Sequence, residues 1–364
     1  MKAELTVSRW DLFTIFNSIY RNKIKQVKIL VPYLKYPLFE IAVQQNRAQI
    51  KLNYKQHEYN KEIEQYRFLR AFQEIPDFSS VKEVIIQSGI LEYSNLTELL
   101  AELHRACQWD YIKGERPVYM ALDTNLMRDR FYSTQHAWLE TLPQNKTGFS
   151  ISPYIKGELD FTRCKYKQGY LSQLKKACVH PVFHNYYTKF FNQNCLNERK
   201  RRLGYLEFEK VHRLQWVIML PTLDEDELQE NGDQNIILNY QKAAEDRNLN
   251  VFLLSRDSDF IARAEGIVGI HPFLLETPAL PDSPLLTKDW YQLSQFFYCM
   301  AVHFGMIRVE TQLSKMILLG IWSGKKPGDW KKENLILHFD TTQTVAEKLF
   351  IQLVKLRELK WEYE

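Results

Sequence analysis

Two apolar runs, far apart in the chain, end in acidic residues and lead into helical patterns. The first covers residues 118–122 and is followed by Asp123; the second covers residues 250–254 and leads to Asp257. Continuous apolar runs of this length are typical of strands buried on both faces of a parallel sheet. Because ligands bind at the carboxyl edge of such sheets, we expect both acids to lie at that edge.

Further apolar stretches alternate with helical patterns around these two runs. Strands are predicted at 149–153, 215–220 and 268–275, and the intervening helices include 126–142 and 234–247. This alternation predicts an α/β domain with a central parallel sheet over residues 117–276.

The segments on either side of this domain show helical periodicity instead. Leu12, Phe16 and Ile19 fall on one face of a helix. The apolar stretch 296–307 is too short and too polar to cross a membrane, so we expect a buried helix there. We therefore expect a mainly helical N-terminal domain of unknown role (1–113) and, after a proline-rich linker, an α-rich C-terminal domain (285–364). The predicted fold class is α/β with largely helical flanks.

Composition excludes several classes of protein. The chain is 45% hydrophobic and 25% charged, with a formal net charge of +4, as in ordinary soluble proteins. Its 5 cysteines are scattered and form no CxxC pair, which indicates neither a disulfide framework nor a thiolate zinc site. The first ten residues lack a secretory signal pattern. We interpret the chain as a cytoplasmic protein with reduced thiols and no membrane span.

The positive charge is concentrated in a segment that interrupts the predicted α/β domain, a helical insert at about 161–213. Residues 161–220 hold twelve lysines and arginines against three acids, and seven tyrosines and phenylalanines are interleaved with them over residues 166–191. Cationic and aromatic side chains together are typical of single-stranded nucleic-acid binding. An amphipathic helical pair with its aromatics in the core explains the pattern equally well. The candidate nucleic-acid contacts are Lys165, Lys167, Lys175, Lys176, Arg199, Lys200, Arg201, Arg202 and Arg256.

Four acids are predicted at the carboxyl ends of strands. Besides Asp123 and Asp257, they are Glu158, in the second turn of the helix after strand 149–153, and Asp233, at the start of helix 234–247. Each alone has an ordinary explanation as a helix cap or a solvated residue. Together at one edge they would repel one another unless a divalent cation compensates, and oxygen ligands favour Mg²⁺ or Mn²⁺.

Polar residues beside these acids are candidates for orienting them. Thr124, Asn125 and Ser255 follow the two strands and can hydrogen-bond the carboxylates. Asp259 is either an accessory ligand or the N-cap of a helix starting at Phe260, and we favour the cap.

These residues together resemble the PIN-domain ribonucleases over about 118–275. The resemblance is carried by Leu122-Asp123-Thr124-Asn125, by Glu158, by Gly232-Asp233 and, most specifically, by Ser255-Arg256-Asp257-Ser258-Asp259-Phe260. It implies a three-layer α/β/α domain, Asp123, Glu158, Asp233 and Asp257 as metal ligands, and products with a 5′-phosphate and a 3′-hydroxyl. The spacing from Glu158 to Asp233 is longer than in small members of the family, because of the basic insert.

The leading functional hypothesis is a metal-dependent endoribonuclease acting on single-stranded RNA, with single-stranded DNA as another substrate. An inactive nucleic-acid-binding module and a structural or interaction protein are the alternatives. Protein partners and self-association are left open by the sequence.

Overall fold

The chain divides into two compact units. The computed structural model describes residues 4–108, 116–143, 146–160, 164–312, 314–321 and 331–339. One unit comprises Met1–Leu91, Arg163–Arg199 and Leu280–Glu364, and we call it the antiparallel unit. The other comprises Glu92–Thr162 and Lys200–Ala279, and we call it the parallel unit.

An eight-stranded sheet forms the antiparallel unit, with the strand order β1-β13-β12-β11-β2-β3-β4-β10. All neighbouring strands are antiparallel. The strands are β1 (Glu4–Ser8), β2 (Val27–Leu30), β3 (Phe39–Val43), β4 (Ala48–Leu52), β10 (Leu285–Leu286), β11 (Met306–Glu310), β12 (Lys315–Leu319) and β13 (Asn334–Phe339). Segments from both flanks thus build one sheet, because β1 pairs with β13 and β2 pairs with β11.

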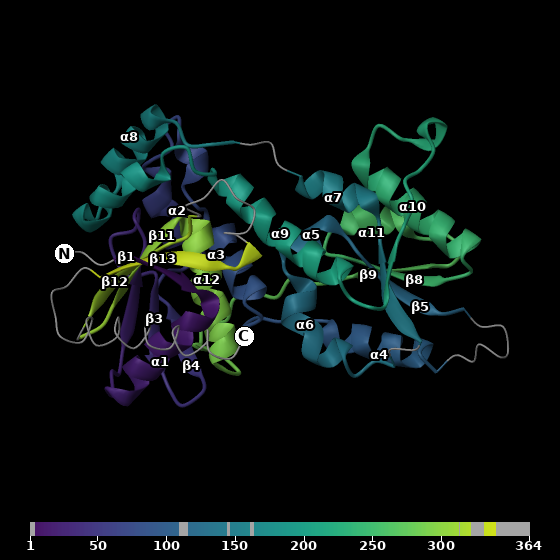
Figure 1. Cartoon of the computed structure of the whole chain (residues 1–364), viewed down its shortest axis with the longest axis horizontal. Coiled ribbons are helices and arrows are strands. Elements are labelled where there is room, and N and C mark those ends of the chain that lie inside the picture. Colours follow the sequence, from purple (N-terminus) through teal and green to yellow (C-terminus); the bar gives the residue numbers. More distant parts are fainter. Residues whose placement is uncertain are drawn as a thin grey trace, which may run out of the picture. The chain divides into compact units, whose positions relative to one another are not determined.

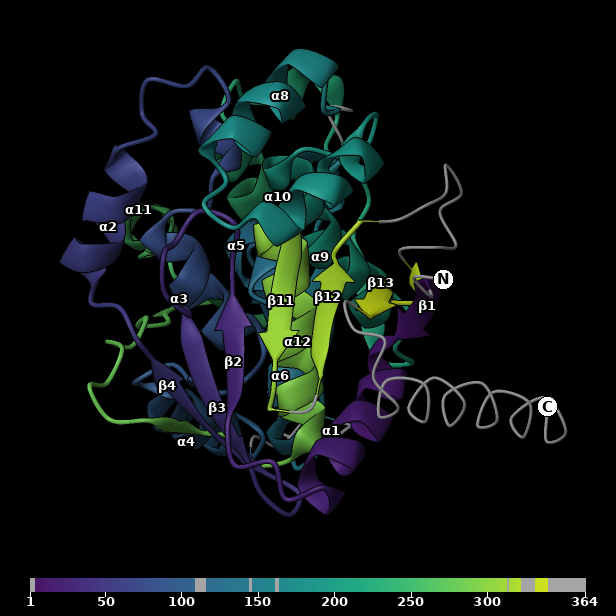
Figure 2. The same cartoon turned by 90° about the vertical axis from the view of Figure 1, so that its left-hand side faces the viewer.

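Helix α12 (Trp290–Phe304) is the central helix of this unit. It lies behind β11 and β12 in Figure 2 and is buried from Gln292 to Phe304. A helix that is buried on every side needs neighbours on every side, and α12 contacts α1, α3 and β11. The unit's other helices are α1 (Leu12–Arg21), α2 (Gln56–Glu64), α3 (Phe78–Gln87) and α8 (Gln168–Ala177), with 3-10 segments η1 (Arg9–Asp11), η2 (Phe72–Glu74) and η4 (Pro181–Phe190).

The prediction of two separate, largely helical flanking domains was wrong. Helix α1 and the buried helix in 296–307 were found, but the flanks also supply every strand of the eight-stranded sheet. The strands are short. In β2 and β4, buried apolar residues alternate with exposed polar ones, and the charged residues at the exposed positions make these strands hard to recognise in the sequence. The basic segment 163–199 belongs to the antiparallel unit, so it is not simply an insert of the α/β domain. Residues 340–364 lie outside the described residues.

The parallel unit contains the predicted parallel sheet. Its five strands follow the order β7-β6-β5-β8-β9, and all neighbours are parallel. They are β5 (Val118–Leu122), β6 (Thr147–Ile151), β7 (Val217–Met219), β8 (Asn250–Ser255) and β9 (Ile270–Leu274). Burial is confirmed for three of the predicted strands: β6 is buried throughout, and β5 and β8 are each buried except at one residue. The strand expected at 215–220 is present as β7 but is only half-buried.

Helices cover both faces of this sheet. In Figure 1, α10 and α11 lie on one side of its strands, and α4 and α6 lie on the other. The helices of this unit are α4 (Leu96–Ala106), α5 (Thr124–Arg128), α6 (Phe131–Leu139), α7 (Pro153–Leu159), α10 (Gly232–Asp246) and α11 (Ser258–Ala264), with the 3-10 turn η5 (Glu225–Glu227). Helix α9 (Leu196–His212) begins in the antiparallel unit and ends in the parallel one.

The single helix predicted at 126–142 is two helices in the structure. Arg130 adopts a left-handed conformation with φ 60°, which ends one helical segment and starts the next. Helix α5 is therefore short, and Asp129 lies at its C-cap. This break matters for the site, because Asp129 faces the residues that follow β8.

Candidate active site

Asp123 follows directly after β5 and caps helix α5. Its side chain is only 6% exposed. One carboxylate oxygen accepts a hydrogen bond from the backbone N–H of Thr124 at 2.5 Å. The other accepts from Asn125 Nδ2 at 2.6 Å and from Ser255 Oγ at 2.7 Å. The structure thus brings the three predicted orienting residues together around Asp123.

The position of Asp123 follows from the strand order. The connections run outward from β5 in one direction through β6 and β7, and in the other through β8 and β9. The point between β5 and β8 is therefore a topological switch point, where open α/β sheets bind ligands. Ser255 ends β8 beside Asp123, and its hydroxyl also accepts from Asn125 Nδ2 at 3.0 Å.

The electrostatic environment of Asp123 disfavours its ionised form. Burial is the largest cause and raises the pKa of Asp123 from 3.8 to about 6. The hydrogen bonds from Ser255 and Thr124 act against this shift. The negative charges of Glu158 and Asp233 raise the pKa further, so both acids lie within electrostatic range of Asp123.

Glu158 and Asp233 come from neighbouring helices. Glu158 lies near the end of α7 and is half-buried, and Asp233 is in the first turn of α10. A Cβ placed on Gly232 would lie 2.9 Å from Oε1 of Glu158, so the start of α10 approaches Glu158 closely. Asp233 is paired with Arg263, with Nη1 and Oδ2 3.4 Å apart. Glu158 and the start of α10, which carries Asp233, thus lie close together, and both acids are within electrostatic range of Asp123.

Asp257 is the N-cap of helix α11. Its side chain caps α11 by accepting from the backbone N–H groups of Asp259 at 2.9 Å and Phe260 at 3.3 Å. Its own N–H donates to Ser255 Oγ at 2.9 Å. The favoured prediction that Asp259 caps a helix starting at Phe260 was wrong: the helix starts at Ser258, and the cap is Asp257. Asp259 lies exposed in the first turn.

The four expected metal ligands are not arranged as a complete coordination group. Among the described residues, no three His, Cys, Asp or Glu side chains are grouped so that they could hold a metal ion. Two observations nevertheless fit a cation at this edge. The side-chain atoms near Asp123 that could coordinate a metal are oxygens. In addition, two buried hydroxyl oxygens, Thr124 Oγ1 and Ser152 Oγ, have no hydrogen-bond partner among the described residues. A hydrated Mg²⁺ or Mn²⁺ suits such oxygen-rich surroundings.

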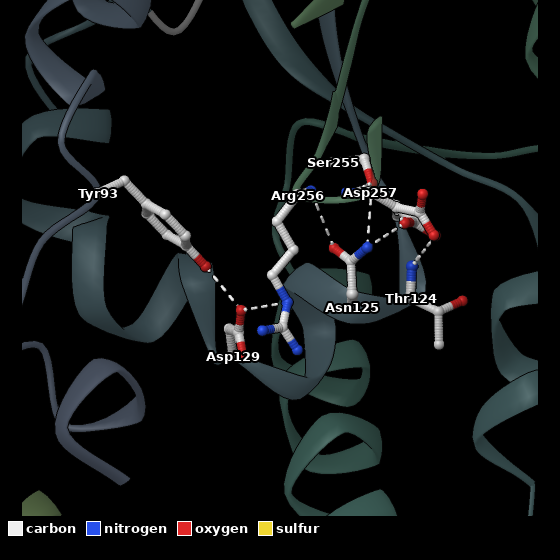
Figure 3. A network of polar contacts seen from close by, with 8 residues as sticks. Tyr93, Thr124, Asn125, Asp129, Ser255, Arg256 and Asp257 are labelled. Carbon is white, nitrogen blue, oxygen red and sulfur yellow. Dashed lines mark hydrogen bonds and ion pairs between the residues drawn. The ribbon is translucent and has the colours of Figure 1, made fainter. Parts of the chain in front are cut away.

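A second polar network extends from the same edge. Arg256 donates through Nε to the buried carboxylate of Asp129 at 3.0 Å, and Tyr93 donates its hydroxyl to the same oxygen at 2.8 Å. The backbone N–H of Arg256 donates to Asn125 Oδ1 at 3.4 Å. Figure 3 shows the chain of contacts from Tyr93 through Asp129 and Arg256 to Asn125 and Ser255. Asn125 therefore joins the Asp123 cluster to the arginine.

Sequence reasoning missed Asp129 and Arg128. Asp129 lies four residues after Asn125, on the same face of a helix, and this spacing could have indicated that it belongs to the site. No spacing in the sequence indicated Arg128, because the proximity of its side chain to the site depends on how α5 packs.

The predicted nucleic-acid contacts divide between the two units. Lys167, Lys175 and Lys176 are exposed and Lys165 is half-buried, all in the antiparallel unit. Lys200, Arg201 and Arg202 are half-buried and belong to the parallel unit, as does Arg256. The prediction for Arg199 was wrong. Its guanidinium is buried and donates to the carbonyl of Val302 at 2.7 Å and to the hydroxyl of Tyr166 at 2.9 Å, which are contacts of the core.

The aromatic side chains of the basic segment mostly pack inward. Five of the seven are buried, namely Tyr166, Phe183, Tyr186, Tyr187 and Phe190. Tyr170 is half-buried, and Phe191 is 58% exposed. The packing interpretation of this pattern is therefore confirmed for five of these residues, whose rings are not accessible for base stacking.

Comparison with protein families, curated proteins and solved structures gave no match to this chain. Within the described part of the chain, no helix combines the length and apolar character needed to cross a bilayer. Function is therefore inferred from the residues of the site.

Proposed function

We propose that the chain is a metal-dependent, PIN-like endoribonuclease that hydrolyses single-stranded RNA. The observation that carries this proposal is Asp123. It is buried at the switch point of a parallel sheet, and burial with the charges of Glu158 and Asp233 raises its pKa to about 6. A carboxylate kept in such surroundings is costly when ionised, and perturbed acids in this position are typical of functional sites.

A divalent cation would offset that cost. Asp123, Glu158 and Asp233 are the residues that would hold it, with Asp257 contributing only if it gives up the cap of α11. A bound Mg²⁺ or Mn²⁺ polarises a phosphodiester and lowers the pKa of a water molecule. The protein's part is to fix Asp123: Thr124, Asn125 and Ser255 hold both of its oxygens in place.

Asp233 has a competing partner in the present structure. Its ion pair with Arg263 is partly exposed, with side-chain exposures of 42% and 43%, and such pairs are weak. The ion pair can therefore exchange for a cation at little cost.

Cleavage of a labelled single-stranded RNA tests the proposal. The purified chain is expected to cut with Mn²⁺ or Mg²⁺, to leave 5′-phosphate ends, and to stop when EDTA is added. Asp123→Asn should abolish cutting while the circular dichroism spectrum is retained. Asp246→Asn is the matched control, because Asp246 is exposed at the far end of α10.

Two results would reject the hydrolase. Cutting that survives both EDTA and Asp123→Asn would point to a contaminant. Binding of RNA without cutting under any metal would instead support an inactive binding module.

A further inference from the structure

Arginines from three different elements lie near the carboxylates of the candidate site. We propose that Arg128, Arg201 and Arg256 bind backbone phosphates of a single-stranded nucleic acid beside Asp123 and Glu158. This inference rests on the proposed function, because it places the substrate of that same site. It adds Arg128 to the residues expected from the sequence and assigns the three arginines one ligand.

Arg128 is the last residue of α5, the helix that Asp123 caps. Its side chain is half-buried. Burial lowers the pKa of Arg128, and the charge of Arg201 lowers it further, whereas Glu158 and Asp123 act in the opposite direction. Arg128 is thus held within electrostatic range of a second arginine and of two acids at the proposed metal site.

The packing of α9 places Arg201 beside Arg128. A Cβ on Gly204 would lie 2.8 Å from Cδ2 of Leu159 and 3.1 Å from Cγ of Arg128, so α9 approaches α5 and α7 very closely there. Arg201 lies three residues before Gly204, on the same face of the helix. The glycine permits this approach, and the approach brings the two arginines together.

Arg256 reaches the site from the end of β8. Its Nε–H pairs with the buried carboxylate of Asp129, and Tyr93 holds that carboxylate from the other side. The side chain of Arg256 is still 28% exposed, so solvent and ligands can reach it. A charge fixed in this way binds a ligand with little loss of side-chain entropy.

Phosphate is the ligand that fits three such arginines. Like charges placed together destabilise the fold unless an anion lies between them. The planar guanidinium group donates two parallel hydrogen bonds to phosphate oxygens, which favours arginine over lysine in such sites. A cation on the neighbouring carboxylates would reduce their hold on the arginines and leave the cluster positive. A phosphodiester spanning cation and arginines then satisfies both.

We call Arg128, Arg201 and Arg256 the phosphate clamp. Binding of a fluorescent single-stranded RNA, measured by anisotropy over a range of salt concentrations, tests this clamp. Asp123→Asn serves as the background in every sample, so that no cutting occurs. Arg128→Gln, Arg201→Gln and Arg256→Gln should each weaken binding several-fold and lower the slope of log K against log salt by about 0.7, the value for one phosphate contact. Arg213→Gln is the control: Arg213 directly follows the last residue of α9, its side chain is 68% exposed, and it is paired with Glu209.

The slope separates a phosphate contact from a structural role. A variant that merely loosens the fold lowers affinity and leaves the slope unchanged, which would overturn the clamp for that residue. Arg128→Lys guards against misfolding of Arg128→Gln, since it should restore most of the slope through its charge. If the slopes fall as expected but the wild type never cuts RNA, the clamp stands and the hydrolase fails. If the wild type cuts RNA and the slopes do not change, the reverse holds.

Two cysteines in the antiparallel unit support a second, independent inference. Cys164 Sγ donates to Cys195 Sγ at 2.8 Å, and the backbone N–H of Cys195 donates to the carbonyl of Cys164 at 3.1 Å. The adjacent residues Lys165 and Asn194 form an antiparallel bridge. Cys164 is exposed, whereas Cys195 is buried. Burial raises the pKa of the Cys195 thiol, as does the neighbouring Cys164.

We infer that these thiols are a modification site that forms a disulfide on oxidation. With a low-molecular-weight disulfide as the oxidant, Cys164 attacks a sulfur atom and releases one small thiol. Cys195 then displaces the second small thiol from the mixed disulfide. The protein loses two protons and two electrons, and the small disulfide takes them up and is reduced to two thiols. The new bond would close a loop that contains α8 and η4.

Treatment of the full chain with oxidised glutathione, followed by digestion and mass spectrometry, tests this site. A peptide linked through Cys164 and Cys195 is expected in the wild type. Cys178→Ser, at another buried cysteine of the same segment, should still give the link. Cys195→Ser should leave glutathione on Cys164. Glutathione retained on Cys164 in the wild type, or no reaction at all, would overturn the inference.

Discussion

Replacing Asp123 by Asn should stabilise the protein at neutral pH, provided that divalent metals are removed. Burial and neighbouring acids raise the pKa of Asp123 from 3.8 to about 6 in the folded state. Between these values the folded state binds more protons than the unfolded state, so the free energy of unfolding falls as pH rises. The destabilisation by the ionised Asp123 is complete above about pH 6 and absent below about pH 4. The asparagine does not titrate and carries no such cost.

The expected size follows from the pKa shift and from one lost contact. A shift of roughly two units corresponds to about 3 kcal/mol. The new amide can keep its oxygen toward Asn125 and Ser255, and its NH2 group then faces the Thr124 N–H, from which the carboxylate had accepted a hydrogen bond at 2.5 Å; this costs about 1 kcal/mol. At pH 7.5 the variant should therefore be more stable by about 2 kcal/mol. Near pH 4 the advantage should disappear.

Urea unfolding in EDTA, measured from pH 4 to pH 8, tests this expectation. The transitions of the two units are fitted separately, because two compact units need not unfold together. Asp246→Asn replaces an exposed residue, so the difference in the free energy of unfolding between this variant and the wild type should stay the same across this pH range. A difference between wild type and Asp123→Asn that stays constant with pH would refute the reasoning, since Asp123 would then titrate normally.

Two further substitutions act on the neighbouring acids. Arg263→Gln should tighten Mn²⁺ binding several-fold in calorimetry, because it removes the cation that pairs with Asp233; unchanged or weaker binding would show that Asp233 is not a ligand. Gly232→Ala should displace Glu158, whose Oε1 would lie 2.9 Å from the new Cβ, and so reduce metal-dependent cleavage. Gly157→Ala, whose Cβ meets nothing within 4 Å, is its control, and equal activity of the two variants would contradict a role for Glu158.

The parallel sheet could be predicted because its strands are buried on both faces. β5 and β8 are nearly continuous apolar runs, and each ends in an acid that turns into a helix, so the local sequence contains most of the information. The eight-stranded sheet could not be predicted in the same way. Its strands are short and half-polar, and pairs such as β1 with β13 join opposite ends of the chain. No local pattern records such a partner.

The candidate site was predictable in position but not in the task of each acid. Spacing placed Asp123 and Asp257 at strand ends, and both lie there. Whether an acid is buried among donors, like Asp123, or caps a helix, like Asp257, depends on side-chain packing. The charge pattern misled at Arg199 for the same reason, since its guanidinium is satisfied by core carbonyl and hydroxyl groups.

Direct titration with Mn²⁺, followed by electron paramagnetic resonance, tests the central claim that the acids at this edge hold a cation. We expect the wild type to bind Mn²⁺ and Asp246→Asn to match it. Asp123→Asn should weaken binding at least about tenfold. Failure of the wild type to bind, or equal affinity in wild type and Asp123→Asn, would contradict the assignment of a metal site at Asp123.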